Sequence, residues 1–579
     1  MSSFITTDYY NYLCFSAYII LFLVNLFALV KYFKNRDKAT KPYNKILKFD
    51  IVYMAIGLIF IVIERFFTLY CLKTNTDESF HLAIALKYIH GDNFWIDIDP
   101  SSVGPLNTLL FSFISIFTGE MSYFTAKITT LSVICISFIL LYLSFIKIVP
   151  RTIACLISTC FAIHMCIPSG STSISYNSEM ILLPLLSLWL YSHLKWQQGS
   201  KYWMYLEFLV IGLMPFGKLQ FGPVALLLFI VGISLLIKKE LINKNDFSLK
   251  NLIKITFLPS ICSALPLIVI SLDAYMHNGL IWFYRFYFLN MISYINVDHL
   301  SWNDSPSQIM FDHLVFFWTD RFFLYFLSAF DFILIVACLL TRKYFIAIFC
   351  LLFIGISAYE VVKPLFYFLH YTNIMIIPLF VCGALLLGKL NSAKCYLLAI
   401  TAYIFVAGYY IADFKEDIEY RELWLNRSEY KSPWNNIAMD IKKMADENDR
   451  LVVWGWLDEL YVNSELPGGT AEIAIGGFVP SMDINRIYPK YTKEKFIDDI
   501  INNKPRFIID TPSPVTPTYN SYDYSINHFS DISELIKENY HVVKEYVLSG
   551  NCEKETTEQN QCIKIPLYEL NKINLIDKE

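Results

Sequence analysis

The sequence has 579 residues, of which 55% are hydrophobic, 17% are aromatic and only 17% are charged. Its mean hydropathy is +0.45, and a soluble chain of this length could not bury so much apolar surface. The formal net charge of −4 excludes a strongly basic protein, and we expect no nucleic-acid partner.

The apolar residues form runs of about 17 to 23 residues, which is the length needed to cross a bilayer core. These runs predict a polytopic α-helical membrane protein that is in contact with membrane lipids. A further apolar segment, 104–118, begins with Gly-Pro, and its length leaves open whether it spans. We expect about twelve transmembrane helices, at 12–33, 51–71, 124–146, 152–168, 179–194, 203–217, 220–237, 254–272, 320–341, 344–360, 367–388 and 395–412.

Basic residues predict the orientation, because Lys and Arg collect in cytoplasmic loops. Six lysines and arginines lie between the first two predicted spans, and Lys31 lies at the end of the first span, so this loop should be cytoplasmic and the N-terminus external. If 104–118 crosses the membrane, most of the Lys and Arg residues in the short loops after residue 146 become external; if it lies flat on the outer face, they become cytoplasmic, as the rule requires. The predicted external segments are then 72–123, 169–178, 273–319, 361–366 and the tail.

The tail differs in character from the rest of the chain. We predict a transmembrane domain at 1–412 and a soluble extracytoplasmic α/β domain at 413–579. The tail contains two cysteines, Cys552 and Cys562, which either form a disulfide or remain free thiols. Helices are expected at 434–447, 492–503 and 531–539, and strands at 451–454, 506–510, 541–548 and 562–567.

The most informative motif is Asp77-Glu78, which directly follows the second predicted span. A carboxylate at the membrane surface can act as a general base towards a hydroxyl or an amine. The alternative is structural, because Asp77 could cap the helix that begins near Ser79. His81, one turn further on, is either a metal ligand together with Asp77 or a surface histidine.

If the reaction takes place at the membrane surface, we expect one substrate to be a lipid. The leaving group is then a lipid phosphate, whose charge requires cationic or hydrogen-bonding partners. Glu179 is a second acid that enters a span from the predicted outer face, and it is either functional or a helix cap. Asp97 and Asp99 are loop acids near the motif. Each basic or aromatic candidate could instead be an interfacial anchor. These candidates are Lys218, Arg285, His370 and Tyr371.

Several of these segments resemble the GT-C glycosyltransferases. Asp77-Glu78 and Gly104-Pro105-Leu106 resemble the first extracytoplasmic loop of that family, and Asn177-Ser178-Glu179 resembles the acid at the head of a middle span. The branch that is most similar is the dolichyl-phosphate-mannose protein mannosyltransferases with their bacterial relatives, including the lipid A aminoarabinose transferases. Three further segments fit in order: Leu213 to Lys218, His370-Tyr371 with Pro378, and Val453 to Tyr461.

The resemblance implies an inverting transferase of the bacterial inner membrane that moves a sugar from a polyprenyl phosphate to a lipid, glycan or protein acceptor at the outer face. Asp77 is then the base, and Glu78 shares its proton, orients the acceptor or caps the helix. The chain departs from the pattern in its extra first span and in Ser102-Val103 before Gly104, where many relatives have a basic residue. No motif indicates a metal site, and the cofactor requirement stays open.

Three alternatives remain. A polymerase or ligase of lipid-linked glycans would transfer a long chain instead of one sugar. A transporter would place its charged residues near the bilayer midplane, often in related halves. A non-catalytic assembly protein of the cell envelope would tolerate Asp77→Asn.

Overall fold

The computed structural model describes most of the chain. The described residues are 7–34, 46–70, 76–100, 103–166, 174–243, 247–289, 306–320, 322–364, 368–412, 418–419, 421–422, 433–455, 457–473, 489–511, 525–547 and 564–571. Cys552 and Cys562 lie outside these residues, so the disulfide hypothesis stays a prediction.

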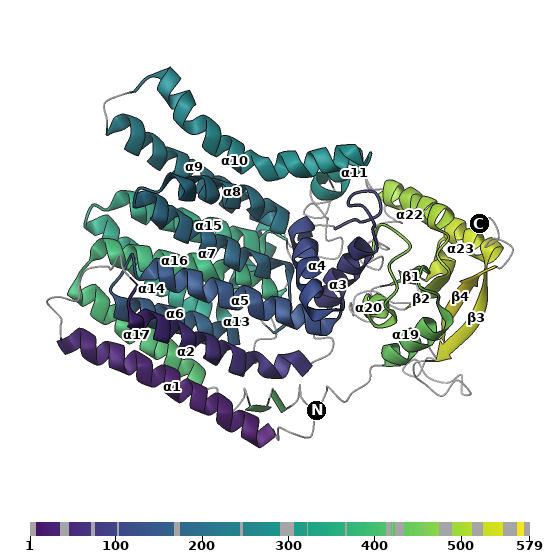
Figure 1. Ribbon diagram of the computed structural model, residues 1–579, viewed down its shortest axis with the longest axis horizontal. Helices are drawn as coiled ribbons and strands as arrows, with labels where there is room; N and C mark the ends of the chain where they lie inside the picture. Colours follow the sequence, from purple (N-terminus) through teal and green to yellow (C-terminus); the bar gives the residue numbers. More distant parts are fainter. Residues whose placement is uncertain are drawn as a thin grey trace.

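A bundle of apolar helices makes up most of the molecule (Figure 1). Among the described residues, seven helices are long and apolar enough to cross a membrane, and five further apolar helices have 10–17 residues. The protein is therefore a polytopic membrane protein, although the number of twelve spans stays a prediction. The long helices of the bundle are α1 (Thr7–Lys34), α2 (Lys48–Arg65), α5 (Tyr123–Phe145), α6 (Arg151–Cys166), α7 (Leu182–Gln197), α8 (Lys201–Gly217), α9 (Gly222–Ile237), α10 (Leu249–Met276), α14 (Phe322–Leu340), α15 (Tyr344–Val362), α16 (Asn373–Leu390) and α17 (Ala393–Ala412).

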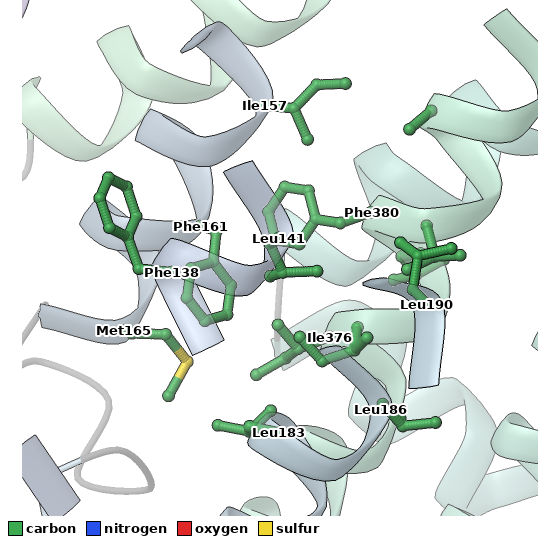
Figure 2. Close-up of a cluster of buried hydrophobic side chains, with 14 of the residues drawn as sticks. Phe138, Leu141, Ile157, Phe161, Met165, Leu183, Leu186, Leu190, Ile376 and Phe380 are labelled. Carbon is green, nitrogen blue, oxygen red and sulfur yellow. The ribbon is translucent and has the colours of Figure 1, made fainter. Parts of the chain in front are cut away.

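The bundle is held by one large cluster of buried apolar side chains. Figure 2 shows its centre, where Leu141 of α5, Phe161 of α6, Leu183 of α7 and Phe380 of α16 converge. The segment of η7 and α16 is the most enclosed of the candidate spans, whereas most side chains of α10 are exposed on the outside of the bundle. A side chain that faces lipid loses no apolar contact, so the exposed face of α10 is compatible with a membrane.

Two short helices, α3 (Thr76–Ile89) and α4 (Pro105–Thr118), lie between the bundle and the C-terminal region (Figure 1). With 14 residues, α4 is about 21 Å long at 1.5 Å per residue, which is short of the ~30 Å hydrocarbon core. Since α6 and α7, with 16 residues each, are also shorter than this core, the juxtamembrane position of 104–118 stays a prediction. Further short helices are η1 (Phe66–Tyr70), η3 (Ser178–Ile181), η4 (Leu219–Phe221), η5 (Lys238–Ile242), α11 (Leu280–Phe283), η6 (Tyr284–Leu289) and η7 (Leu369–Thr372).

Two short helices were not predicted. α20 (Glu459–Ser464) lies in the C-terminal tail, and α13 (Pro306–Asp320) begins in the predicted external segment 273–319 and ends at the first residue of the next predicted span. The external position of 273–319 stays a prediction. A 15-residue helix that directly precedes an apolar run is easily assigned to the loop, because charge patterns locate spans and not short helices between them.

The C-terminal region contains a four-stranded sheet in the order β1-β2-β4-β3. β1 (Leu451–Trp454) and β2 (Phe507–Asp510) are parallel, whereas β4 (Lys564–Leu570) runs antiparallel to both β2 and β3 (Tyr540–Val547). All four strands coincide with the predicted segments, which confirms the α/β class. The accompanying helices are α19 (Pro433–Met444), α20 (Glu459–Ser464), α22 (Pro489–Asn503), η9 (Ile526–His528) and α23 (Ser530–Asn539).

Candidate active site at the start of α3

Asp77 lies in the first turn of α3 and is partly accessible. Its side chain is 35% exposed, and its Oδ2 lies 3.4 Å from Nε2 of His370, whose side chain is 17% exposed. His370 belongs to η7, which directly precedes α16. The fold therefore brings the motif after α2 next to the His-Tyr pair of a late span. An accessible carboxylate beside an imidazole can accept a proton from a bound substrate.

Glu78 lies next to Asp77 in sequence but has a different environment. Its side chain is fully buried and accepts hydrogen bonds from Nζ of Lys127 at 2.8 and 2.7 Å. The backbone N–H of Tyr176 donates a third hydrogen bond at 3.3 Å. Lys127 lies in the second turn of α5. Glu78 therefore connects α3 to the bundle, and its carboxylate is not presented to solvent.

The sequence analysis did not single out Lys127. The sequence did contain one indication, because Lys127 lies close to the start of an apolar run. An ionisable residue within a span usually has a specific partner, so an acidic partner could have been expected. Glu78 and Lys127 are 49 residues apart, so no local spacing connects them.

A second ion pair lies close to His370. Glu179 of η3 is fully buried and pairs with Nζ of Lys218, which follows the last residue of α8. The same Nζ lies 4.3 Å from the ring centroid of Tyr371, and Tyr371 contacts the ring of His370 at a centroid distance of 4.8 Å. Asp77, His370, Tyr371, Lys218 and Glu179 thus form a continuous set of contacts, which we call the polar row.

The turn that carries Lys218 is held against α4. Nδ2 of Asn107 donates to the carbonyl of Gly217 at 2.6 Å, and Oδ1 of Asn107 accepts from the Tyr176 hydroxyl at 2.7 Å. Gly104 precedes α4 with φ +67°, and a Cβ there would lie 2.2 Å from the carbonyl oxygen of Phe216. Only glycine combines this conformation with so close an approach. The Gly-Pro motif therefore places α4 against the end of α8.

His81 is buried, so the expectation of a surface histidine is wrong. Its ring stacks on Phe111 and meets Tyr176 edge-on, with centroid distances of 6.0 and 5.4 Å. Burial lowers the pKa of His81 to about 3, so the ring is neutral at physiological pH. The described residues contain no group of three His, Cys, Asp or Glu side chains that could hold a metal ion. His81 therefore packs behind Asp77 as a neutral aromatic ring.

The helical arrangement is similar to that of ArnT from Cupriavidus metallidurans. The ArnT structure bound to undecaprenyl phosphate aligns with 89% of this chain and 97% of its own, with a TM-score of 0.51 and 11% sequence identity. The apo ArnT structure covers 90% and 97%, with a TM-score of 0.50 and 12% identity. The chain has the GT-C fold. The fold class that the motifs predicted is thereby confirmed.

At this identity the likeness concerns the GT-C fold alone. The apo oligosaccharyltransferase of Archaeoglobus fulgidus is a weaker match, with a TM-score of 0.41 and 12% identity over 79% of this chain and 69% of its own. No protein-family model and no curated protein matches the sequence. Residue roles within this GT-C fold must therefore be argued from the geometry of this chain.

Two predicted site residues, Asp97 and Asp99, make described hydrogen bonds outside the polar row, and a third, Arg285, lies in η6. Asp97 closes a turn by accepting a hydrogen bond from the backbone N–H of Asn93 at 3.0 Å. Asp99 is buried, and its backbone N–H donates to the carbonyl of Ala471 at 3.0 Å, which links the loop to the C-terminal region. Arg285 lies in η6, within the aromatic segment that packs against Trp95. Their predicted binding roles stay predictions.

Proposed function

We propose that this protein is a membrane glycosyltransferase that moves a sugar from a polyprenyl-phosphate donor to a hydroxyl or amine of an acceptor, with inversion at the sugar carbon. The observation that carries the proposal is the contrast between Asp77 and Glu78. One carboxylate is accessible beside His370, and its neighbour is neutralised in a buried pair with Lys127. A general base must be reachable by its substrate.

In the proposed reaction, Asp77 takes the proton of the acceptor hydroxyl or amine. The acceptor atom forms a bond to the anomeric carbon, and the bond between that carbon and the phosphate oxygen breaks. The polyprenyl phosphate departs with the electron pair. The developing phosphate charge requires a cation or a hydrogen-bond donor on the face of the sugar opposite the base. His370 contacts Asp77 and therefore belongs to the acceptor side, where it orients the Asp77 carboxylate.

Lys218 has a less direct role in this scheme. Its charge is balanced by Glu179, and its side chain is only 5% exposed. The pair lies against Tyr371, so it fixes the turn from which His370 projects. We therefore infer that Lys218 and Glu179 position His370, while Asp77 and His370 contact the reactants.

The likeness to an ArnT structure that binds undecaprenyl phosphate supports a polyprenyl-phosphate lipid as the donor. An external location of α3 and of the C-terminal region, in the inner membrane of a bacterium, completes the proposal. It follows from the distribution of basic loop residues and from the motif resemblance. The domain boundary near residue 412 belongs to the same proposal.

The test is turnover of a panel of polyprenyl-phosphate sugars by the purified protein in lipid nanodiscs. Asp77→Asn should lower kcat by roughly 10²–10⁴-fold, which is the usual contribution of general-base catalysis. A matched control is Glu120→Gln, because Glu120 is an exposed acid between α4 and α5 that bonds to the Ser122 hydroxyl. Equal turnover by wild type and Asp77→Asn would remove Asp77 as the base. A product longer than one sugar would favour the polymerase or ligase alternative.

A further inference from the structure

The far end of α3 is attached to the C-terminal region by a buried lysine. Lys87 lies in the last turn of α3, ten residues after Asp77 and thus about 15 Å further along the axis at 1.5 Å per residue. Its side chain is 0% exposed. Nζ of Lys87 donates hydrogen bonds to the carbonyl oxygens of Gly468 at 3.1 Å and Thr470 at 2.6 Å. Both acceptors belong to the segment that follows α20.

An arginine of the C-terminal region completes the attachment. Arg450, directly before β1, binds Asp92 in a bidentate manner at 2.8 and 2.6 Å, and it also donates to the Gly468 carbonyl at 2.9 Å. Nζ of Lys87 lies 3.4 Å from the same Asp92 carboxylate. Two cations from different regions therefore share one carboxylate and one carbonyl. We call Lys87, Asp92, Arg450 and Gly468 the junction.

The junction contains the buried ammonium group of Lys87 at a position where an apolar side chain would be usual. Burial lowers the pKa of Lys87 to about 8, although the Asp92 carboxylate opposes this shift. Burying an ammonium group is costly unless its donors are satisfied, and here they meet two carbonyls and a carboxylate. α3 and α20 already pack against each other, and Ala83, Ile84 and Leu460 belong to one cluster of buried apolar side chains. Lys87 adds directional hydrogen bonds, which fix position more strictly than apolar contact does.

α3 is thus held at both ends by different parts of the molecule. Near Asp77, Glu78 binds Lys127, and the Ser79 hydroxyl bonds with the Tyr123 hydroxyl at 2.8 Å, both within α5. At the other end the junction fixes the helix to the C-terminal region. The position of Asp77 relative to His370 therefore depends on both attachments.

We propose that Lys87 is a positioning residue for the transfer reaction, and that the C-terminal region acts through it to hold Asp77 in place. This inference rests on the proposed function. It gives the C-terminal region a task in catalysis. A misplacement of about 1 Å in a reacting group can lower a rate by roughly 10²-fold, so small movements of α3 should have large effects on turnover.

The experiment compares full-length wild type with Lys87→Met and Lys87→Arg in nanodiscs. Lys87→Met should lower kcat by 10-fold or more while the KM for the polyprenyl-phosphate sugar changes less than two-fold. Lys87→Arg retains charged donors and should recover part of kcat. The control is Lys442→Met, because Lys442 pairs with Glu465 at 2.5 Å on the surface of the same region and should leave both constants unchanged.

Hydrogen exchange provides a second readout that does not depend on turnover. In Lys87→Met, amide exchange in the first turns of α3 should rise at least five-fold, whereas exchange in α5 should stay as in wild type. Unchanged exchange in α3, or unchanged kcat, would overturn the inference, as would an equal loss of protection throughout the protein. If wild type transfers no sugar but exchange rises in α3 alone, the proposed function fails while the attachment stands.

Discussion

Replacing Lys127 with methionine should strongly destabilise the protein, because it leaves the Glu78 carboxylate without its cation. Both side chains are fully buried, and the two hydrogen bonds between them measure 2.7 and 2.8 Å. Removing one partner of such a pair costs about 3–5 kcal/mol, whereas replacing both partners with neutral groups of similar size is often close to neutral. Lys127→Met alone should therefore unfold far more easily than Lys127→Met combined with Glu78→Gln.

The assay is a double-mutant cycle on thermal or denaturant unfolding of the purified protein, with Lys127→Met, Glu78→Gln and the double variant. Because the double variant should be close to neutral, the coupling energy between the two positions should be at least as large as the loss in Lys127→Met alone, about 3–5 kcal/mol. Turnover should fall in both single variants, since Glu78 directly follows Asp77. A Lys127→Met variant as stable as wild type, or a double variant no better than the single one, would refute the argument.

Three further predictions follow from single positions. Gly104→Ala should lower stability by about 1–3 kcal/mol, because alanine is strained at φ +67° and ψ 160°. It should also reduce kcat, because the added Cβ would displace α4 from the Phe216 carbonyl; wild-type unfolding and kinetics would contradict this. Burial raises the pKa of Asp510 to about 7 from 3.8, so the folded state holds a proton that the unfolded state releases. Stability should therefore fall as the pH rises from about 4 to about 7, by up to about 4 kcal/mol at 1.36 kcal/mol per pH unit. Asp510→Asn should flatten this slope of Tm against pH, and an unaltered slope would exclude the assignment. In intact cells, a membrane-impermeant thiol reagent should label Glu120→Cys but not Gln197→Cys, whereas the reverse pattern would invert the topology.

The sequence by itself determined the class of this protein. Long apolar runs predict membrane helices because a bilayer requires about 20 apolar residues in succession, and this information is local. The four strands of the C-terminal region were also readable, since β1 and β2 are short buried apolar segments and β3 is rich in valine and tyrosine, which favour strands. Asp77 could be singled out because two carboxylates beside a span are unusual at any position.

The tertiary structure alone decided which of the candidate residues meet. Asp77 and His370 are far apart in the sequence but lie next to each other in the structure. The partner of Glu78 is Lys127, a lysine that belongs to no recognisable motif. His81 looked like an exposed polar residue, yet it packs between Phe111 and Tyr176. The physical reason is the same in each case. Helix periodicity and hydropathy depend on neighbours along the chain, whereas ion pairs and burial depend on which distant helices pack together. The sequence could therefore identify Asp77 as a carboxylate at the membrane surface, but only the fold shows that Asp77 is accessible whereas Glu78 is buried.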